Sequence, residues 1–237
     1  MTAVLTPFKP GIFTSDFLGS GVRILIAGRN ASAAGVNQEE LAAAGVSVRD
    51  MLLPVQRHTD LVLAVGEHEI TDLSTPADGL MTAECGPVLG VKTADCLSLF
   101  LWDPVSQSAG VVHAGWRGLK AGLPGKAIQF MAHKYGAAET DVRVYLGPRI
   151  CRHCYEVGAE FKEYFPGHFI ETENTTGKGQ LDLGANAAGQ LQDAGILKEN
   201  IGDCGLCTSC DNPLFYSFRK ERTELRNLSL VWISAPD

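Results

Sequence analysis

The stretch of sequence that decides the fold is 88–115, VLGVKTADCLSLFLWDPVSQSAGVVHAG. Two apolar, β-rich runs, LSLFLW and SAGVV, flank the tetrapeptide Asp103-Pro104-Val105-Ser106. A type I turn prefers Asp at its first position and Pro at its second, so the pattern predicts an antiparallel hairpin. A tight turn centred on this tetrapeptide would pair Cys96 directly with His113. Because directly opposed residues have Cβ atoms roughly 4.5–5.5 Å apart, this register predicts that the thiol and the imidazole lie together.

The residues around this pair favour a functional site over simple packing. A lone Cys is usually a small buried hydrophobe. Here, however, Lys92 and Asp95 interrupt an otherwise apolar region, where a charge without a partner is costly. After His113 the chain continues as Gly115-Trp116-Arg117-Gly118. The two glycines allow tight backbone turns, and the Arg fork can contact a bound group.

A third candidate residue is His58, in the segment Gln56-Arg57-His58. This segment lies between the apolar runs MLLPV and LVLAV, so the side chain falls at a break between two predicted strands. Two His and one Cys suit a zinc site that keeps one coordination position open for water or substrate. Copper(II) would bind the same nitrogens more strongly, so the ligand types do not select the metal.

Several longer strings of residues recur in the order of a known family over roughly 50–235. They are ADGLMT, KTADCLSLFLWDP, VHAGWRGL, LGPRICRHCYEVG, LDLGANAAGQL and CTSCDNPLFYSFRKERTELRNLSLVWI. With these strings the chain resembles the YfiH-like family, which is also called the laccase-domain or multicopper polyphenol oxidase family and the peptidoglycan editing factor. The resemblance implies a single α+β domain over 1–237, a layered α/β/β/α sandwich.

The resemblance also implies a zinc site formed by His58, Cys96 and His113, in a purine nucleoside phosphorylase with adenosine deaminase activity. Two departures from the family stand out. The element usually written Gln-Val-His-Gly reads Gln56-Arg57-His58-Thr59 here. The segment Ser-Leu-Asn-x-Gly, which helps to line the family's pocket, is missing from 17–50, so residues 1–50 diverge.

The leading hypothesis is therefore a zinc-dependent enzyme that takes a purine nucleoside and phosphate as substrates. Four residues are predicted to be catalytic: Cys96, His113, Asp95 and Arg117. Arg117 is the candidate for the phosphate or purine side of the pocket. Asp95 could orient a metal ligand or shuttle a proton, or it could be an N-cap or turn residue.

Three alternatives remain open from the sequence. In a metal-free hydrolase or deamidase, Cys96 would be the nucleophile and His113 its base. A cell-wall (peptidoglycan) editing or division protein would carry the site without using it. A copper-dependent polyphenol oxidase would need several coppers with many His ligands, and the chain has six His in total. Copper binding in vitro is therefore expected to be adventitious.

Composition narrows the classes further. A chain of 237 residues with 45% hydrophobic residues can bury one sizeable core. It has no run of ~18 apolar residues, so no membrane span is expected. The first residues lack the basic start and apolar core of a secretory signal, which predicts a cytoplasmic protein. The net charge of −7 without a basic cluster argues against a nucleic-acid partner. The oligomeric state is left open.

Five of the seven cysteines form a separate pattern, Cys151-x-x-Cys154 and Cys204-x-x-Cys207-x-x-Cys210. These thiols suffice for a second, structural zinc site or for a redox pair. The family resemblance favours packing or thiol roles. A reducing compartment makes disulfides the less favoured reading.

The periodicity predicts strands and helices in a mixed order. Strands are predicted at 23–28, 51–56, 61–65, 88–93, 97–102, 108–113, 141–146 and 227–233, and helices at 124–135, 156–165 and 183–194. A further helix is expected between Asn37 and Gly45, where Asn37 and Glu40 resemble a capping box. Asp182 and Gly195 should begin and end the helix at 183–194. The absence of regular βα alternation favours an α+β fold.

Overall fold

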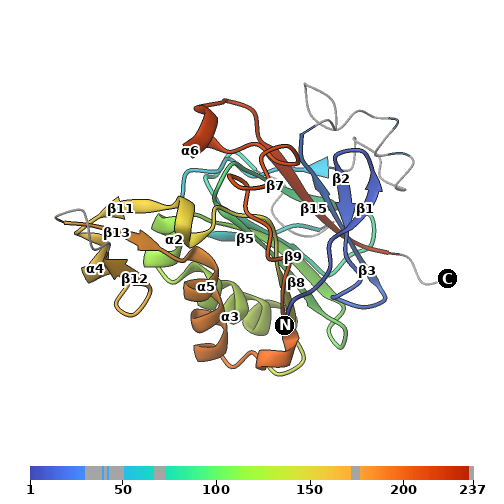
Figure 1. Ribbon diagram of the computed structural model, residues 1–237. Helices are drawn as coiled ribbons and strands as arrows, with labels where there is room; N and C mark the ends of the chain where they lie inside the picture. The colour runs from blue at the N-terminus through green and yellow to red at the C-terminus, as the bar shows by residue number, and fades with distance from the viewer. Residues whose placement is uncertain (30–38, 40–41, 43–50, 67–72, 172–176, 235–237) are drawn as a thin grey trace.

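The computed structural model describes residues 1–29, 39, 42, 51–66, 73–171 and 177–234 (Figure 1). Its strands are β1 (Thr6–Lys9), β2 (Ile12–Thr14), β3 (Val22–Ala27), β4 (Met51–Leu52), β5 (Val62–Ala64), β6 (Gly79–Thr82), β7 (Val88–Thr93), β8 (Leu97–Asp103), β9 (Ser108–Ala114), β10 (Arg143–Leu146), β11 (Glu156–Gly158), β12 (Phe169–Glu171), β13 (Lys178–Leu181), β14 (Ile201–Asp203) and β15 (Asn227–Ile233). Its helices are α2 (Trp116–Lys120), α3 (Leu123–Tyr135), α4 (Phe161–Tyr164), α5 (Leu183–Asp193) and α6 (Phe218–Glu221), with 3₁₀ turns η2 (Arg152–Cys154) and η3 (Lys198–Asn200).

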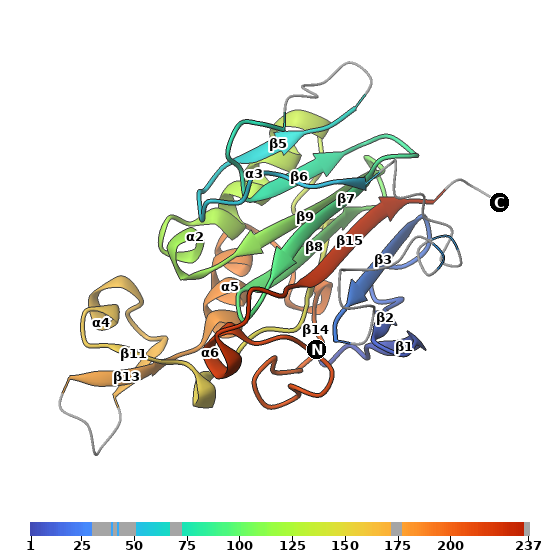
Figure 2. The same ribbon diagram turned by 90° about the horizontal axis from the view of Figure 1, so that it is seen from above.

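Most strands belong to two mixed sheets. The first sheet has the order β1-β2-β3-β15-β7-β4, and the second has the order β14-β10-β8-β9-β6-β5. A small sheet, β11-β13-β12, projects with α4 to the left of both views (Figures 1 and 2). The predicted α+β class is therefore confirmed.

The side chains of β8 alternate between two cores, which explains why every residue of this strand is buried. Phe100 and Trp102 point toward the first sheet and pack in a core with Ile24, Leu89 and Val231. On the other face of the second sheet, Leu97, Leu99 and Leu101 of β8 pack in a core with residues of α3 and α5. Figure 1 shows these two helices beneath β8 and β9. The described part of the chain thus forms a helix layer and two sheet layers.

The predicted hairpin of β8 and β9 is present, but its predicted register is wrong by one residue on each strand. His113 lies opposite Ser98, and Asp103 lies opposite Ser108. The connection has four residues because the Asp103 carboxylate accepts hydrogen bonds from the backbone N–H groups of Val105 and Ser106, each at 3.0 Å. Cys96 consequently precedes β8, diagonal to His113.

Other predictions of elements can be compared in the same way. The strands at 23–28, 61–65, 88–93, 97–102, 108–113 and 227–233 and the helices at 124–135 and 183–194 are confirmed within one residue at each end, whereas the strands at 51–56 and 141–146 are shorter than predicted. Asp182 caps α5 as predicted, by accepting a hydrogen bond of 2.9 Å from the Ala185 N–H.

One predicted helix is wrong, and another cannot be compared. The helix predicted at 156–165 is instead β11 followed by the four-residue α4, because Glu156–Gly158 pairs with Lys178–Gln180 of β13. The helix predicted from Asn37 to Gly45 falls outside the described residues, apart from positions 39 and 42. Among the helices that the structure describes, none is both long and apolar enough to cross a membrane.

Candidate functional site

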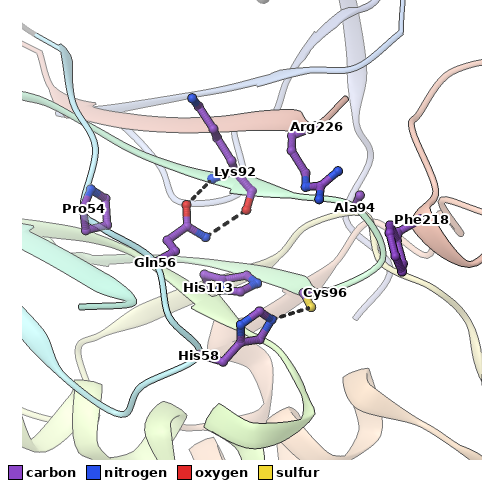
Figure 3. Close-up of a pocket in the computed structure, with 9 residues that line it drawn as sticks. All are labelled: Pro54, Gln56, His58, Lys92, Ala94, Cys96, His113, Phe218 and Arg226. Atoms are coloured by element: carbon purple, nitrogen blue, oxygen red, sulfur yellow. Dashed lines mark hydrogen bonds between the residues drawn. The ribbon is translucent and has the colours of Figure 1, made fainter. Parts of the chain in front are cut away.

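Two connections cross from the first sheet to the second at the same place. The segment 53–61 joins β4 to β5, and the segment 94–96 joins β7 to β8. His58 lies on the first connection and Cys96 on the second, while His113 lies near the end of β9. Residues far apart in the sequence therefore meet where the chain changes sheets (Figure 3).

The three predicted metal ligands come together in the structure. Their donor atoms all lie within 4.8 Å of one another. Cys96 Sγ is 4.0 Å from His58 Nε2, and the centroids of the two imidazole rings are 4.9 Å apart. His113 is buried, Cys96 is half-buried and His58 is exposed. The group is thus open to solvent on the His58 side.

A buried carboxylate, Asp78, holds two of these ligands in place. Its Oδ1 lies 2.7 Å from His113 Nδ1, so this nitrogen donates its proton and Nε2 is left free for a ligand. Its Oδ2 accepts hydrogen bonds from the Thr59 N–H at 2.6 Å, the Thr59 hydroxyl at 2.9 Å and the Arg57 N–H at 3.2 Å. These bonds hold the loop on both sides of His58, whose φ is 58°. A positive φ in a non-glycine residue is a strained conformation that such a network can maintain.

A glycine makes the close approach of the ligands feasible. A Cβ at Gly115 would lie 2.9 Å from Cys96 Sγ and 3.0 Å from His58 Cδ2. Both distances are shorter than normal van der Waals contact. The backbone after β9 can therefore pass behind the thiol and the imidazole only without a side chain.

The charges of the site reinforce one another. Burial would raise the pKa of the Cys96 thiol, but the neighbouring His113 and His58 outweigh it and lower this pKa to about 6. Burial would likewise lower the pKa of His113, whereas the Cys96 thiolate and Asp78 raise it to about 9. For Asp78, burial opposes ionisation, but hydrogen bonds from His113 and Thr59 lower its pKa to about 2. Thiolate and carboxylate are thus both favoured near neutral pH.

The three side chains open into a pocket of about 550 Å³, a size typical of small-molecule sites. Basic and aromatic groups share its wall with the donors. The lining residues are Pro54, Gln56, His58, Lys92, Ala94, Cys96, His113, Phe218 and Arg226 (Figure 3). Gln56 joins the His58 connection to β7, because its amide makes hydrogen bonds of 2.8 and 2.9 Å with the backbone of Lys92.

Asp95 lies beside the site and faces another part of the chain. Its Oδ1 accepts hydrogen bonds of 2.7 Å from the hydroxyls of Thr208 and Ser217, and its Oδ2 accepts one of 2.6 Å from the Arg219 N–H. With a φ of 87°, Asp95 turns the chain just before Cys96. Its carboxylate therefore joins the Cys96 connection to the C-terminal segment.

Arg117 lies outside the residues that line the pocket. Its guanidinium stacks at 4.4 Å over the ring of Trp116, and its side chain is exposed. Tyr155 lies near enough to both Cys96 and Arg117 for their charges to act on its pKa, the first raising it and the second lowering it. Burial is the main cause that raises the pKa of Tyr155 to about 12.

Several residues of the site escaped the sequence analysis. Asp78 appeared only inside the string ADGLMT, and Phe218 and Arg226 only inside the long C-terminal string. The signal for Asp78 is a carboxylate directly before the buried strand β6, which pairs with β9. Finding it would have required knowing that pairing.

The donor set itself fits a metal ion. Two imidazole nitrogens and one thiolate are typical ligands for zinc in an open site, and copper accepts the same donors. A carboxylate that orients a ligating histidine is the usual companion of such a site. The residues present could therefore hold one metal ion.

Known proteins resemble this chain in sequence and in fold. In sequence, the chain is 35% identical over 181 residues to the purine nucleoside phosphorylase of Aquifex aeolicus (strain VF5), covering 76% of this chain and 82% of that protein. It is 33% identical over 189 residues to adenosine deaminase RL5 of an unknown prokaryotic organism, covering 74% and 72%.

In fold, the chain is similar to the solved structure of the hypothetical protein YfiH of Bacillus licheniformis. The TM-score is 0.89 and the identity 22%, over 97% of this chain and 99% of that one. YlmD of Geobacillus stearothermophilus matches with a TM-score of 0.86 at 24% identity, over 98% and 100%. Residues 26–234 match the family described as multi-copper polyphenol oxidoreductase laccase. The chain belongs to this family.

Proposed function

We propose that this protein is a zinc-dependent purine nucleoside phosphorylase that also deaminates adenosine. The observation that carries the proposal is the convergence of His58, Cys96 and His113 on one pocket. The chain that forms this pocket is 33–35% identical to proteins named for these two activities.

The pocket offers complementary groups for both substrates. Lys92 and Arg226 bring positive charge to its wall, which suits an anion such as phosphate. Arg226 is anchored on its own loop, because its Nη1 donates to the carbonyls of Thr223 and Leu225 at 2.8 and 2.9 Å. Phe218 presents an aromatic face on which a purine can stack. Arg117 lies outside the residues that line the pocket, and we propose that it acts on the substrate from the side of Tyr155.

In phosphorolysis, a phosphate oxygen forms a bond to the ribose C1′ while the bond from C1′ to the purine nitrogen breaks. The base leaves with the electron pair and takes up a proton. In deamination, the oxygen of water replaces the amino group of the purine, which leaves as ammonia. Zinc, when bound, supplies a Lewis acid that stabilises negative charge on the reacting oxygen.

The residues of this chain would prepare these steps. Cys96 contributes the anionic charge of the ligand set, and Asp78 holds the His113 ring with Nε2 toward the pocket. Asp95 is proposed to position Cys96 through its hydrogen bonds to the C-terminal segment.

The first test is to incubate metal-analysed protein with adenosine, inosine and methylthioadenosine, with and without phosphate, and to identify the products. We expect phosphate-dependent release of the free base and phosphate-independent conversion of adenosine to inosine. A chelator should abolish both activities, and zinc should restore them. Phenol oxidation that requires copper, with no turnover of nucleosides, would contradict the proposal.

The second test is Cys96→Ser, which removes the thiolate, the one anionic group among the three proposed ligands. We expect loss of the zinc held by His58 and His113, and loss of turnover. Cys85→Ser is the matched control, because Cys85 is an exposed thiol outside this group. If Cys96→Ser protein keeps its full metal content and normal turnover, the site assignment is wrong.

A metal-free cysteine hydrolase is the second candidate function. It is favoured by one observation, the sequence of contacts from Cys96 to His113 to Asp78, which resembles a nucleophile, a base and an orienting carboxylate. Chelated protein that still turns over substrate and is inactivated by a thiol alkylator would support this candidate over the zinc enzyme.

A further inference from the structure

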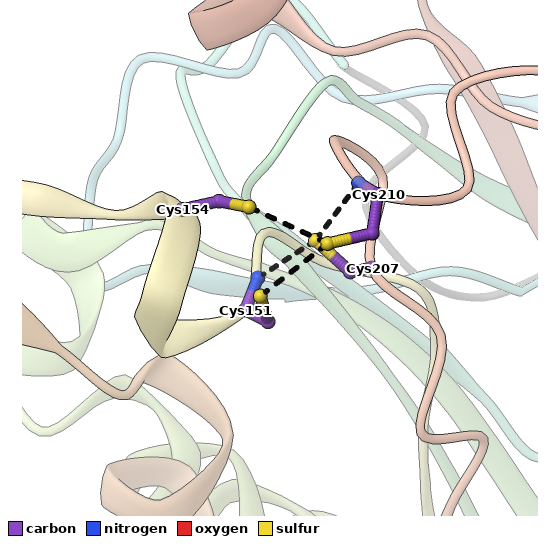
Figure 4. Close-up of side chains that lie close together, drawn as sticks. All are labelled: Cys151, Cys154, Cys207 and Cys210. Atoms are coloured by element: carbon purple, nitrogen blue, oxygen red, sulfur yellow. Dashed lines mark hydrogen bonds between the residues drawn. The ribbon is translucent and has the colours of Figure 1, made fainter.

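A second group of cysteines converges at a distance from the pocket. Cys151 and Cys154 lie at the two ends of the short 3₁₀ turn η2, and Cys207 and Cys210 lie on a turn of the C-terminal segment. The structure brings these two Cys-x-x-Cys pairs together, and Figure 4 shows the four sulfurs pointing toward one another.

The spacing of the sulfurs matches a tetrahedral tetrathiolate site. All four Sγ atoms lie within 4.8 Å of one another. Cys210 Sγ is 3.9 Å from Cys151 Sγ and 3.4 Å from Cys154 Sγ. Zinc–sulfur bonds of about 2.3 Å in a tetrahedron place sulfurs about 3.8 Å apart. The site thus needs only small adjustments to enclose an ion.

The backbone around the group stabilises a thiolate at Cys207. Cys207 Sγ accepts hydrogen bonds from the N–H groups of Cys151, at 3.2 Å, and Cys210, at 3.3 Å. Four thiolates around a divalent ion leave a net negative charge, which nearby cations can offset. Lys220 of α6 supplies one, because its Nζ donates at 3.0 Å to the carbonyl of Ser209, which lies between Cys207 and Cys210 in the chain.

The fifth thiol of the sequence pattern, that of Cys204, lies outside this group of sulfurs. Cys204 is buried and does not belong to the group of four. Its sulfur accepts a hydrogen bond from the Leu206 N–H within its own turn. The segment holds two overlapping Cys-x-x-Cys pairs, Cys204 with Cys207 and Cys207 with Cys210. The structure brings the second pair, not the first, into the group. Cys204 becomes a natural control for tests of the group.

We propose that Cys151, Cys154, Cys207 and Cys210 bind a structural zinc ion. Four thiolates fill its coordination sphere and leave no position for a substrate, as in closed structural zinc sites. Tetrahedral thiolate sets take zinc or iron, and zinc is the ion to which this proposal commits. All seven cysteines are free in the structure, so no disulfide competes for these sulfurs.

The ion would hold together two segments that lie next to the Cys96 connection of the pocket. It would join η2 to the C-terminal segment. Just before η2 the backbone already links the two, because the Thr208 N–H donates to the Arg149 carbonyl at 3.0 Å and the Arg149 N–H donates to the Leu206 carbonyl at 3.3 Å. The side chain of Thr208 in turn binds Asp95, the neighbour of Cys96. Loss of the ion should therefore loosen the Cys96 connection without removing any ligand of the first site.

The experiment measures zinc and iron per chain by elemental analysis in six purified proteins, four that test the two sites and two controls. We expect two zinc ions in the wild type, one in Cys96→Ser, one in the double variant Cys151→Ser/Cys210→Ser, and none when all three changes are combined. Cys204→Ser and Cys85→Ser should each retain two. Because the Cys96→Ser protein isolates the second site, failure of this proposal is distinguishable from failure of the proposed function.

A spectroscopic test needs no change at the cluster. Cys96→Ser protein stripped of metal and titrated with cobalt(II) should bind one ion, with the strong visible and charge-transfer absorption of a tetrathiolate site. Zinc should displace it, and the melting temperature should rise on metal binding. A single zinc per chain that Cys96→Ser removes, iron in place of zinc, or a disulfide among these four cysteines in the purified protein would each overturn the proposal.

Discussion

The carboxylate of Asp78 accepts hydrogen bonds from both sides of the His58, Cys96 and His113 group. A fully buried carboxylate is costly unless it is hydrogen-bonded, and here four donors surround it. The same contacts hold the His113 ring and the loop of His58. Asp78 is therefore a positioning residue for the candidate metal site.

Replacing this carboxylate by an amide tests the role. Asp78→Asn retains the size of the side chain but removes its charge and one acceptor. We expect zinc affinity at the first site to fall by roughly 10–100-fold, the effect typical of losing the carboxylate behind a ligating histidine. The measurement is the zinc dissociation constant by competition with a chelating dye.

Asp103→Asn is the matched control for this substitution. Asp103 is also a fully buried carboxylate that accepts two backbone N–H groups, but it lies in the turn between β8 and β9. It should lower stability without changing zinc affinity. Equal loss of zinc affinity in both variants would show that Asp78 acts only through general stability.

Some residues of the site could be recognised from their neighbours in the sequence, and others could not. Cys96 and His113 could be predicted because reactive and charged residues interrupt apolar strands there. Asp78 could not, because its importance depends on β6 lying beside β9, some thirty residues away in the chain. Likewise, Arg117 was predicted to face the substrate, whereas Lys92 and Arg226 line the pocket.

At the scale of elements, local chemistry predicted the longest strands of the two main sheets and the two longest helices, α3 and α5, but not the short elements or the exact pairing. The turn residues Asp103 and Pro104 correctly indicated the hairpin. The register depended on how many backbone groups the Asp103 side chain would cap, which the residue types alone do not fix. The helix predicted at 156–165 is wrong for a related reason. Its first residues pair with β13, a strand more than twenty residues further along the chain.

The connection from β9 to α2 offers a test at this scale. Gly115→Ala would place a methyl group 2.9 Å from Cys96 Sγ. Overpacking of this kind costs roughly 1–3 kcal/mol, so we expect zinc affinity at the first site to fall by about tenfold or more. Gly125→Ala in α3 is the control, because its added Cβ would have no neighbour closer than 3.8 Å. Unchanged zinc affinity in Gly115→Ala would show that the ligands do not need this close approach.

For the whole molecule, two stacked sheets create the conditions for the site. The connections 53–61 and 94–96 both cross from the first sheet to the second at the same edge, and they carry His58 and Cys96. The sequence predicted the long strands of both sheets, and the family resemblance implied two stacked sheets covered by helices, of which the described residues show one helix layer. The crossing itself could not be predicted, since it depends on which strands pair with β7 and β8.

An ion pair at another edge should make the stability of the whole molecule depend on pH. Arg149 donates two hydrogen bonds, of 2.8 and 2.6 Å, to the Asp203 carboxylate at the end of β14. Burial would raise the pKa of Asp203, but Arg149 outweighs it and holds this pKa below its ordinary value. Because the folded state favours the charged carboxylate, the pair stabilises the protein above the unfolded pKa of about 3.9 and loses this effect as the pH falls through the folded pKa.

Asp203→Asn should therefore destabilise the protein at neutral pH and matter less in acid. We expect a loss of about 1–3 kcal/mol in the free energy of unfolding at pH 7, typical of hydrogen bonds to charged groups and limited here by partial exposure of the carboxylate. Urea unfolding of both proteins from pH 7 to pH 3 measures it, with Asp141→Asn, an exposed carboxylate, as the control. Since protonation of the metal ligands affects both proteins alike, the difference between them isolates Asp203. A difference that stays constant down to pH 3 would mean that the carboxylate's charge contributes nothing and that the pair acts only through its shape.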